Sequence, residues 1–165
     1  MPQAITDPIR TLLVDNEELI GQVKGLIDSK HLVKIRVKGN SMFPFLRHDR
    51  DIVTLKYPQV EDLSPGRIVM FWYRGRQILH RIVFQKDNLY YIRGDNSRNY
   101  ILEYAGYEDI IGVVTSLQRG DKMILCDNRW WKLLSFLWIK TYRPRVFFYR
   151  ARNFAVRILK KLVRK

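Results

Sequence analysis

The stretch RIVMFWYRGRQILHRIVF, residues 67–84, contains two runs of β-branched, aromatic and other apolar residues joined by a short polar segment. Arg74-Gly75-Arg76 separates the runs, and a glycine between two strand-like segments is a turn signal. Val, Ile, Phe, Trp and Tyr favour strands because their side chains pack well on a pleated surface. The stretch therefore predicts two antiparallel strands joined by a tight turn.

Strand-like runs continue on both sides of this hairpin. They are VKIRV (33–37), DIVTLKY (51–57), LYYIR (89–93), IIGVVTSLQ (110–118) and KMILC (122–126). Many short strands separated by turn signals are typical of antiparallel sheets that bend strongly. We therefore predict a mainly β fold, built as a strongly bent antiparallel sheet or partial barrel.

Helical periodicity occurs at both ends of the chain. Residues 12–29 carry apolar side chains three or four positions apart, which predicts an N-terminal amphipathic helix. The helical period returns after Asn128, and Pro144 is expected to open a C-terminal amphipathic helix because the first turn does not need its N–H. The predicted organisation is a helical segment at 1–30, a central domain at 31–128 and a basic helical tail at 129–165.

The positive charge of the chain is concentrated in this tail. The formal net charge is +14, yet residues 1–128 contain 18 basic and 16 acidic side chains. Residues 129–165 contain 12 Lys or Arg and no Asp or Glu. The body is therefore not a broad phosphate-binding surface, although a basic tail could still meet nucleic acid.

Metal and disulfide chemistry is not expected. Cys126 is the only cysteine, so it has no partner for an internal disulfide, and the spaced Cys and His residues of a zinc site are missing. We interpret Cys126 as a small, partly buried apolar residue, and we expect no cofactor.

The stretch KGNSMFPFL, residues 38–46, places Ser41 on a Gly-Asn turn just before a methionine and a proline. A serine hydroxyl is a poor nucleophile unless a base lies within hydrogen-bond reach. The best candidate base is His80, in QILHRIV, because a strand can present one side chain toward a neighbouring loop. Taken separately, an ordinary loop serine and a core histidine also explain these two residues.

Three blocks in order, GNSMFPFLRHDRDIV, ILHRIV and YIRGDNS, resemble the serine-peptidase superfamily of type I signal peptidases and LexA-type self-cleaving repressors. The resemblance covers roughly residues 33–120. His80 stands where bacterial signal peptidases have a lysine, which is similar to the histidine-type enzymes of the endoplasmic reticulum and archaea. The resemblance implies the catalytic fold of that superfamily over 31–128. It also implies serine endopeptidase activity through an acyl-enzyme, with Ser41 as nucleophile and His80 as base.

The resemblance implies roles for neighbouring residues as well. The Ser41 N–H is expected to be the first oxyanion donor. Many signal peptidases have a hydroxyl residue where this chain has Gly39, so Asn40 or a backbone N–H is expected as the second donor. Asp95 matches the first acid that orients the histidine in such enzymes, and Glu103 is the candidate for the second. By the same resemblance, the methionine after Ser41 is expected to be a buried anchor and Asp51 to be structural.

The tail also carries the features of a helix that lies on a membrane. It contains Trp130, Trp131 and Trp138, and apolar and basic side chains segregate along the helix predicted after Pro144. The sequence has neither a signal peptide pattern nor a run of about 18 apolar residues. We therefore expect peripheral association with an anionic membrane on the cytoplasmic side, and a peptide or precursor protein as substrate.

Two other interpretations remain open. The chain could be a non-catalytic module that binds a membrane or nucleic acid through its tail, although nucleic acid is the less favoured partner. It could also be a LexA-like regulator that cleaves itself. Such regulators have a DNA-binding domain before the catalytic domain and cut an Ala-Gly bond between the two. Here the segment before Ser41 is too short for a helix-turn-helix domain, and the Ala105-Gly106 bond follows the serine rather than preceding it.

Overall fold

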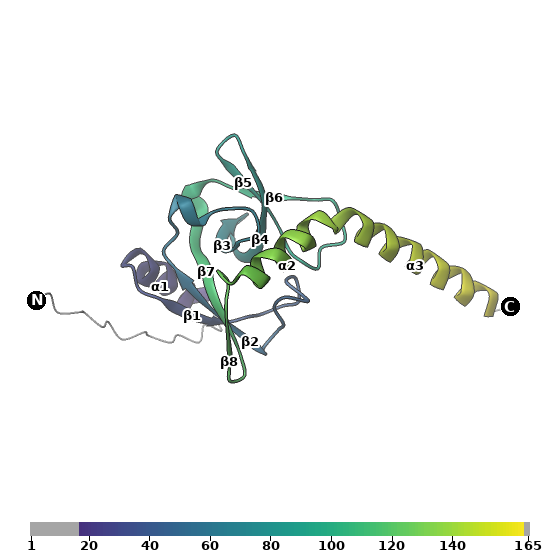
Figure 1. Ribbon diagram of the computed structural model, residues 1–165, viewed down its shortest axis with the longest axis horizontal. Helices are drawn as coiled ribbons and strands as arrows, with labels where there is room; N and C mark the ends of the chain where they lie inside the picture. The colour runs from purple at the N-terminus through teal and green to yellow at the C-terminus, as the bar shows by residue number, and fades with distance from the viewer. Residues whose placement is uncertain (1–16, 164–165) are drawn as a thin grey trace, which may run out of the picture.

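The computed structural model describes residues 17–163 and is mainly β (Figure 1). Its helices are α1 (Glu17–Asp28), α2 (Arg129–Lys140) and α3 (Tyr142–Val163), with short 3-10 helices η1 (Val60–Asp62) and η2 (Tyr107–Asp109). Its strands are β1 (Val33–Arg36), β2 (Asp51–Lys56), β3 (Ile68–Tyr73), β4 (Arg76–Lys86), β5 (Leu89–Arg93), β6 (Glu103–Ala105), β7 (Ile110–Arg119) and β8 (Lys122–Leu125). Every predicted strand is present, and β6 is an additional strand that the sequence pattern did not predict.

The strands form one antiparallel sheet in the order β1-β2-β7-β3-β4-β5-β6, with β8 paired to the end of β7. β7 pairs with β2 on one side, and with β3 and then β8 on the other. Register shifts in the β2–β7, β3–β7 and β4–β5 pairs mark bulges, which bend strands. Among the described strands, the edges β1 and β6 do not pair, so the sheet is open. The predicted mainly β, antiparallel fold is confirmed.

The strand β3 is buried on both faces. Ile68 and Met70 belong to one apolar cluster, whereas Val69 and Phe71 belong to a second one. This division follows from strand geometry, because successive side chains point to opposite faces of a sheet. The first cluster also includes Ile27 of α1, which is fully buried. α1 confirms the described part of the helix predicted over 12–29; residues 12–16 of that helix lie outside the described residues.

The C-terminal helices begin at well-defined signals. The side chain of Asn128 accepts a hydrogen bond from the N–H of Trp130 (2.8 Å) and caps α2. α3 begins at Tyr142, two residues before the predicted start at Pro144. Pro144 thus lies within the first turn of α3, where a backbone N–H has no partner inside the helix.

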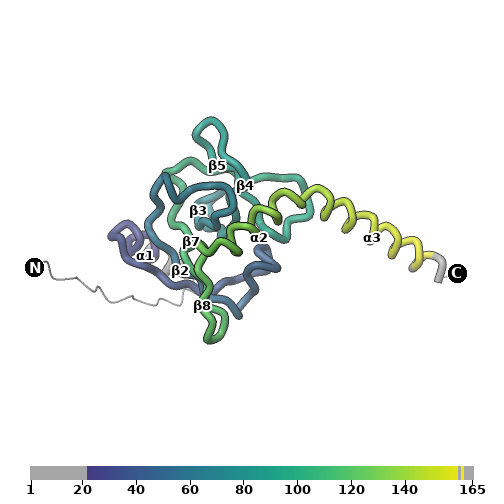
Figure 2. Tube along the Cα trace, viewed as in Figure 1, coloured from purple at the N-terminus to yellow at the C-terminus, as the bar shows by residue number. Residues whose placement is uncertain are grey.

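The two C-terminal helices differ in how they pack. α2 runs across the body, whereas most of α3 extends away from it (Figures 1 and 2). Ser135 of α2 is 1% exposed, whereas Phe147 and Phe154 of α3 are 67% and 65% exposed. Within residues 17–163, no helix has both the length and the apolar character needed to cross a membrane.

Candidate active site

Ser41 lies in the loop between β1 and β2, and its neighbours hold this loop in place. Met42 and Leu46 are 2% and 0% exposed and belong to the core cluster under α1. Gly39 has a φ of +79°, a conformation that glycine adopts without steric cost, and its N–H donates to His48 Nδ1 (3.0 Å). The apolar anchors are therefore buried while Ser41 itself stays exposed.

Asp51, at the start of β2, ties the end of this loop to the sheet. Its buried carboxylate accepts hydrogen bonds from Arg50, from Arg119 and from the N–H of Arg47. Arg119 also donates to the carbonyl oxygen of Phe45 (2.9 Å). Burial alone would raise the pKa of Asp51, but these hydrogen bonds outweigh burial and lower the pKa to about 2. Asp51 thus fixes the loop that carries Ser41, in keeping with the structural role expected for it.

His80 lies on β4 and Glu103 on β6. His80 Nδ1 and Glu103 Oε2 are 2.5 Å apart, and their side chains are 11% and 22% exposed. Because a carboxylate only accepts, this contact favours the tautomer in which Nδ1–H donates to Glu103 and Nε2 keeps its lone pair. The Glu103 carboxylate therefore fixes both the orientation and the tautomer of the imidazole.

The segment Gly94–Asn96, which follows β5, brings Ser41 and His80 together. The N–H of Asn96 donates to the Ser41 carbonyl oxygen (2.8 Å), and Asn96 Nδ2 donates to the Asn40 carbonyl oxygen (3.2 Å). A Cβ added at Gly94 would lie 2.9 Å from His80 Nε2 and 2.9 Å from the Ser41 carbonyl oxygen. Any larger residue at position 94 would therefore press on both groups, and only glycine lets the imidazole and the Ser41 backbone pack this closely around it.

Ser41, His80 and Glu103 line one polar pocket of about 470 Å³. The other lining residues are Asn40, Arg93, Gly94, Asn96, Ser97, Asn99 and Ile101. Among the described residues the Ser41 hydroxyl makes no hydrogen bond to His80. Rotation about one side-chain bond changes where that hydroxyl points, and such contacts are often looser before substrate binds.

Asp95 does not contact His80 but binds Arg81. The two carboxylate oxygens of Asp95 accept from Arg81 Nε (2.8 Å) and Nη2 (2.7 Å), and both side chains are almost fully buried. Arg81 also donates to Ser135 Oγ (2.7 Å), and its guanidinium lies 4.4 Å from the ring centroid of Phe45. Of the two candidate orienting acids, Glu103 is the one at the histidine, whereas Asp95 joins the sheet, the serine loop and α2.

The two residues expected to supply the oxyanion donors, Ser41 and Asn40, both line the pocket. Within residues 17–163, the Ser41 N–H has no hydrogen-bond partner, so it is free to donate to a substrate oxygen. Asn40 also lines the pocket and is exposed, and its carbonyl oxygen is already bound to Asn96. No group of three His, Cys, Asp or Glu side chains in this part of the chain is arranged to hold a metal ion.

Trp138, which the sequence analysis placed among the membrane-binding features of the tail, instead contacts the site, and Tyr142 and Arg93 complete its surroundings. Trp138 Nε1 donates to the Asp95 carbonyl oxygen (3.2 Å), and the Tyr142 hydroxyl donates to the Asn99 carbonyl oxygen. The Arg93 guanidinium stacks on Tyr142, 3.2 Å from the ring centroid. α2 and the start of α3 therefore support the segment that follows β5, a contact that no sequence pattern indicates.

Comparison of the sequence with protein-family models finds no match, and comparison with curated proteins finds none either. The interpretation of this pocket therefore rests on its geometry and chemistry.

Proposed function

We propose that the protein is a serine endopeptidase in which Ser41 is the nucleophile and His80 the base. The observation that carries the proposal is the close packing of His80 and Ser41 around Gly94. His80 Nε2 and the Ser41 carbonyl oxygen each lie 2.9 Å from the position that a Cβ at Gly94 would occupy. His80 is also held from its other side by Glu103. A nucleophile, a base and an orienting carboxylate in one pocket form the arrangement that acyl transfer needs.

The proposed mechanism follows from these positions. His80 Nε2 takes the proton of the Ser41 hydroxyl while Oγ attacks the carbonyl carbon of the scissile bond. The Ser41 N–H donates to the oxyanion that develops on the carbonyl oxygen. The imidazolium, stabilised by Glu103, then gives its proton to the leaving amine, and an acyl-enzyme forms on Ser41. Water hydrolyses this ester by the same proton transfers in reverse, which restores Ser41.

Other bases fit the pocket less well. Lys38 and Lys56 would be the alternative bases, yet neither is among the residues that line the pocket. Lys38 contacts Asp49 (2.9 Å) and Lys56 contacts Asp62 (2.8 Å). Self-cleavage at Ala105-Gly106, which the alternative interpretation as a LexA-like regulator would need, fits less well too, because Ala105 is 1% exposed and paired with Tyr90 in the sheet.

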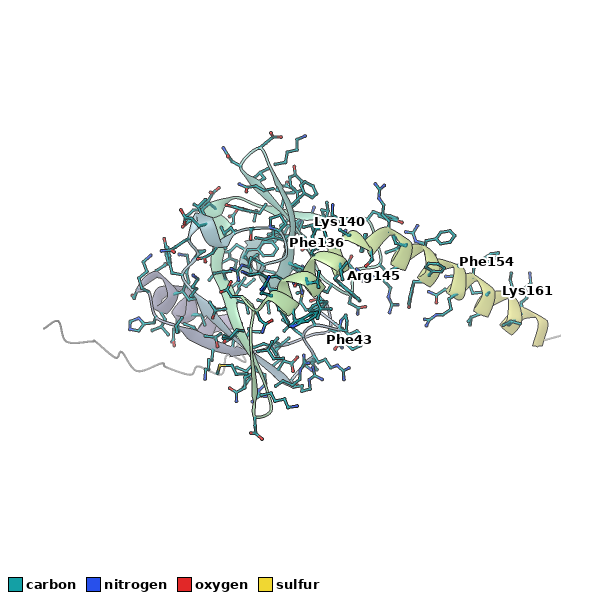
Figure 3. The ribbon with its side chains drawn as sticks, in the orientation of Figure 1. Phe43, Phe136, Lys140, Arg145, Phe154 and Lys161 are labelled. Atoms are coloured by element: carbon teal, nitrogen blue, oxygen red, sulfur yellow. The ribbon has the colours of Figure 1, made fainter. Side chains whose placement is uncertain are left out.

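An anionic membrane surface is the proposed second partner. Large apolar side chains are exposed along both C-terminal helices, among them Trp130 and Phe136 on α2 and Phe154 on α3. Phe154 and Lys161 protrude from the part of α3 that leaves the body (Figure 3). Exposed aromatic residues beside 12 basic and no acidic residues suit the boundary between lipid tails and anionic headgroups. This association would be peripheral and would keep Ser41 near membrane-bound peptides.

Digestion of a proteome-derived peptide library, read by mass spectrometry, tests the proposed activity. The intact protein should cut at a defined set of peptide bonds. Ser41→Ala and His80→Ala should each lower the rate by several orders of magnitude, and the double variant should lose little more, because the two residues act as a unit. Ser64→Ala removes an exposed serine outside the pocket and should leave the rate unchanged. Cleavage that persists in either single variant would contradict the proposal.

A further inference from the structure

Arg93 is a cationic side chain of the pocket that the mechanism does not use. It is the last residue of β5, directly before Gly94, and it lines the pocket with Ser41 and His80. Within residues 17–163, no carboxylate lies within ion-pair distance of Arg93. Its contact is the face of Tyr142, which leaves the hydrogen-bond donors of the guanidinium without an anionic partner.

The surroundings of Arg93 carry more positive than negative charge. Arg93 and Arg145 both interact electrostatically with the Asp95 carboxylate, but Arg81 occupies its two oxygens. Burial lowers the pKa of Arg93 and of Arg145, and repulsion from Arg93 lowers the pKa of Arg145 further. Glu103, the carboxylate inside the pocket, is bound to His80. Arg81, Arg93 and Arg145 therefore share the single Asp95 carboxylate, and Arg93, a partly buried cation in this excess of positive charge, is among the residues that line the pocket.

We propose that Arg93 binds a carboxylate of the substrate, so that the pocket selects peptides with an acidic group near the scissile bond. The inference rests on the proposed peptidase function. A guanidinium presents paired N–H groups that match the two oxygens of a carboxylate, and such a bond gains strength where water is excluded. The carboxylate belongs either to an Asp or Glu side chain or to the free C-terminus of the peptide. Polar side chains around it, including Asn99 and Ser97, complete a wall suited to a charged group.

Binding of the Ser41→Ala variant to a peptide array tests this inference without requiring catalysis. Each Asp or Glu peptide on the array has an Asn or Gln partner, and each sequence is present with a free and with an amidated C-terminus. Acidic members should bind about tenfold more tightly than their amide partners, as expected for one charge-assisted bond. A preference for acidic side chains and a preference for free C-termini identify the two sources of the carboxylate.

The matched variants separate Arg93 from the general positive charge of the chain. Arg93→Gln in the Ser41→Ala background should abolish the preference. Arg98→Gln removes the same charge from the neighbouring loop, where Arg98 stacks on Tyr149 outside the pocket. This control variant should keep the preference for acidic peptides. Equal binding of acidic and amide members, or a preference that survives Arg93→Gln, would overturn the inference. The library digestion separately decides whether the protein cleaves, so a failed peptidase proposal and a failed carboxylate site give different results.

Discussion

Glu103 and Asp95 are carboxylates with different partners, so their amide variants should have different effects. Glu103→Gln replaces an acceptor-only carboxylate with an amide that can also donate to His80 Nδ1, so the tautomer is no longer fixed; it should lower kcat by roughly 10²–10⁴-fold with little change in stability. Asp95→Asn leaves the buried Arg81 unpaired, and should destabilise the fold by about 3–5 kcal/mol. Peptide cleavage measures the loss of kcat, and urea unfolding measures the loss of stability, on both variants. An inactive Asp95→Asn protein of normal stability would place Asp95 in the catalytic machinery after all.

Gly94 tests whether the close packing of Ser41 and His80 matters. A methyl group at this position would press on His80 Nε2 and on the Ser41 carbonyl oxygen, both 2.9 Å away. Gly94→Ala should therefore displace one of them and lower kcat/KM by about 100-fold, the cost of a misplacement of about 1 Å. Gly25→Ala in α1 is the matched control, because a Cβ there would meet no atom within 4 Å. Equal activity of the two variants would refute the packing argument.

Asp51 should make the stability of the protein depend on acid pH. Its pKa of about 2 in the folded protein is below the ordinary 3.8, so its contribution is complete above about pH 5 and is lost as the pH falls toward 2. Asp51→Asn should cost about 2 kcal/mol at pH 7, and much less near pH 2. Urea unfolding of both proteins at several pH values measures the difference. A difference that does not shrink with acid would show that the charge of Asp51 is not what stabilises the loop.

Cys126, the one cysteine of the chain, is a buried free thiol. Cys126 is 4% exposed, and burial raises its pKa to about 11, which leaves almost no thiolate at neutral pH. Its location agrees with its interpretation as a small apolar residue, and slow alkylation in the folded state is expected.

At the scale of elements, the strands were predictable because β-branched, aromatic and other apolar residues gather in short runs that turn signals separate. β3 and β4 show this best, with residues 67–84 matching a hairpin almost end to end. β6 is only three residues long, Glu103–Ala105, and such a short segment carries no periodicity. Its pairing with β5 is a tertiary contact, so only the folded chain reveals that Glu103 reaches His80.

Strand alternation explains why the two acids were hard to assign. His80 and Arg81 are adjacent on β4, so their side chains point to opposite faces of the sheet. Asp95 lies on the Arg81 side, although it stands next to the Gly94 that contacts His80. The sequence alone does not show which face Asp95 joins, because Asp95 lies in the turn after β5, where strand alternation no longer sets the direction of a side chain.

The boundary between packed and projecting parts of the tail gives a prediction about truncation. Deleting 147–165 removes seven of the 12 tail Lys and Arg residues but none of the contacts made by Ser135, Trp138 and Tyr142. That protein should fold normally and cleave soluble peptides, and its binding to anionic liposomes at low salt should fall at least about tenfold, since each cation contributes up to about 1 kcal/mol. Deleting 129–165 also removes those packing contacts, and should lower stability as well.

A pair of substitutions separates lipid binding from stability in the full chain. Phe147→Ser with Phe154→Ser removes two exposed rings from α3 and should weaken liposome binding without changing the midpoint of urea unfolding. Val60→Ser removes an exposed apolar side chain from η1 and should change neither liposome binding nor the midpoint of urea unfolding. Unaltered liposome binding by the double variant, or by the chain lacking 147–165, would exclude α3 as the membrane-binding element.

At the scale of the whole molecule, the excess positive charge and the proposed catalytic residues occupy different regions. The nearly neutral body holds Ser41, His80 and Glu103, while the basic helix α3 projects from it (Figure 1). The start of α3 nevertheless reaches the pocket wall, because Tyr142 contacts both Asn99 and Arg93. In the proposed membrane-bound state, α3 would therefore bind the anionic surface while the catalytic residues lie on the body.

The most direct test of the account is covalent labelling of the intact protein with a fluorophosphonate, followed by mass-spectrometric mapping of the modified residue. Fluorophosphonates react with serine hydroxyls that a neighbouring base activates. We expect a single adduct on Ser41, absent in Ser41→Ala, strongly reduced in His80→Ala and unchanged in Ser64→Ala. A protein that forms no adduct, or one whose Ser41 is labelled equally well without His80, would contradict the claim that these two residues form a catalytic pair.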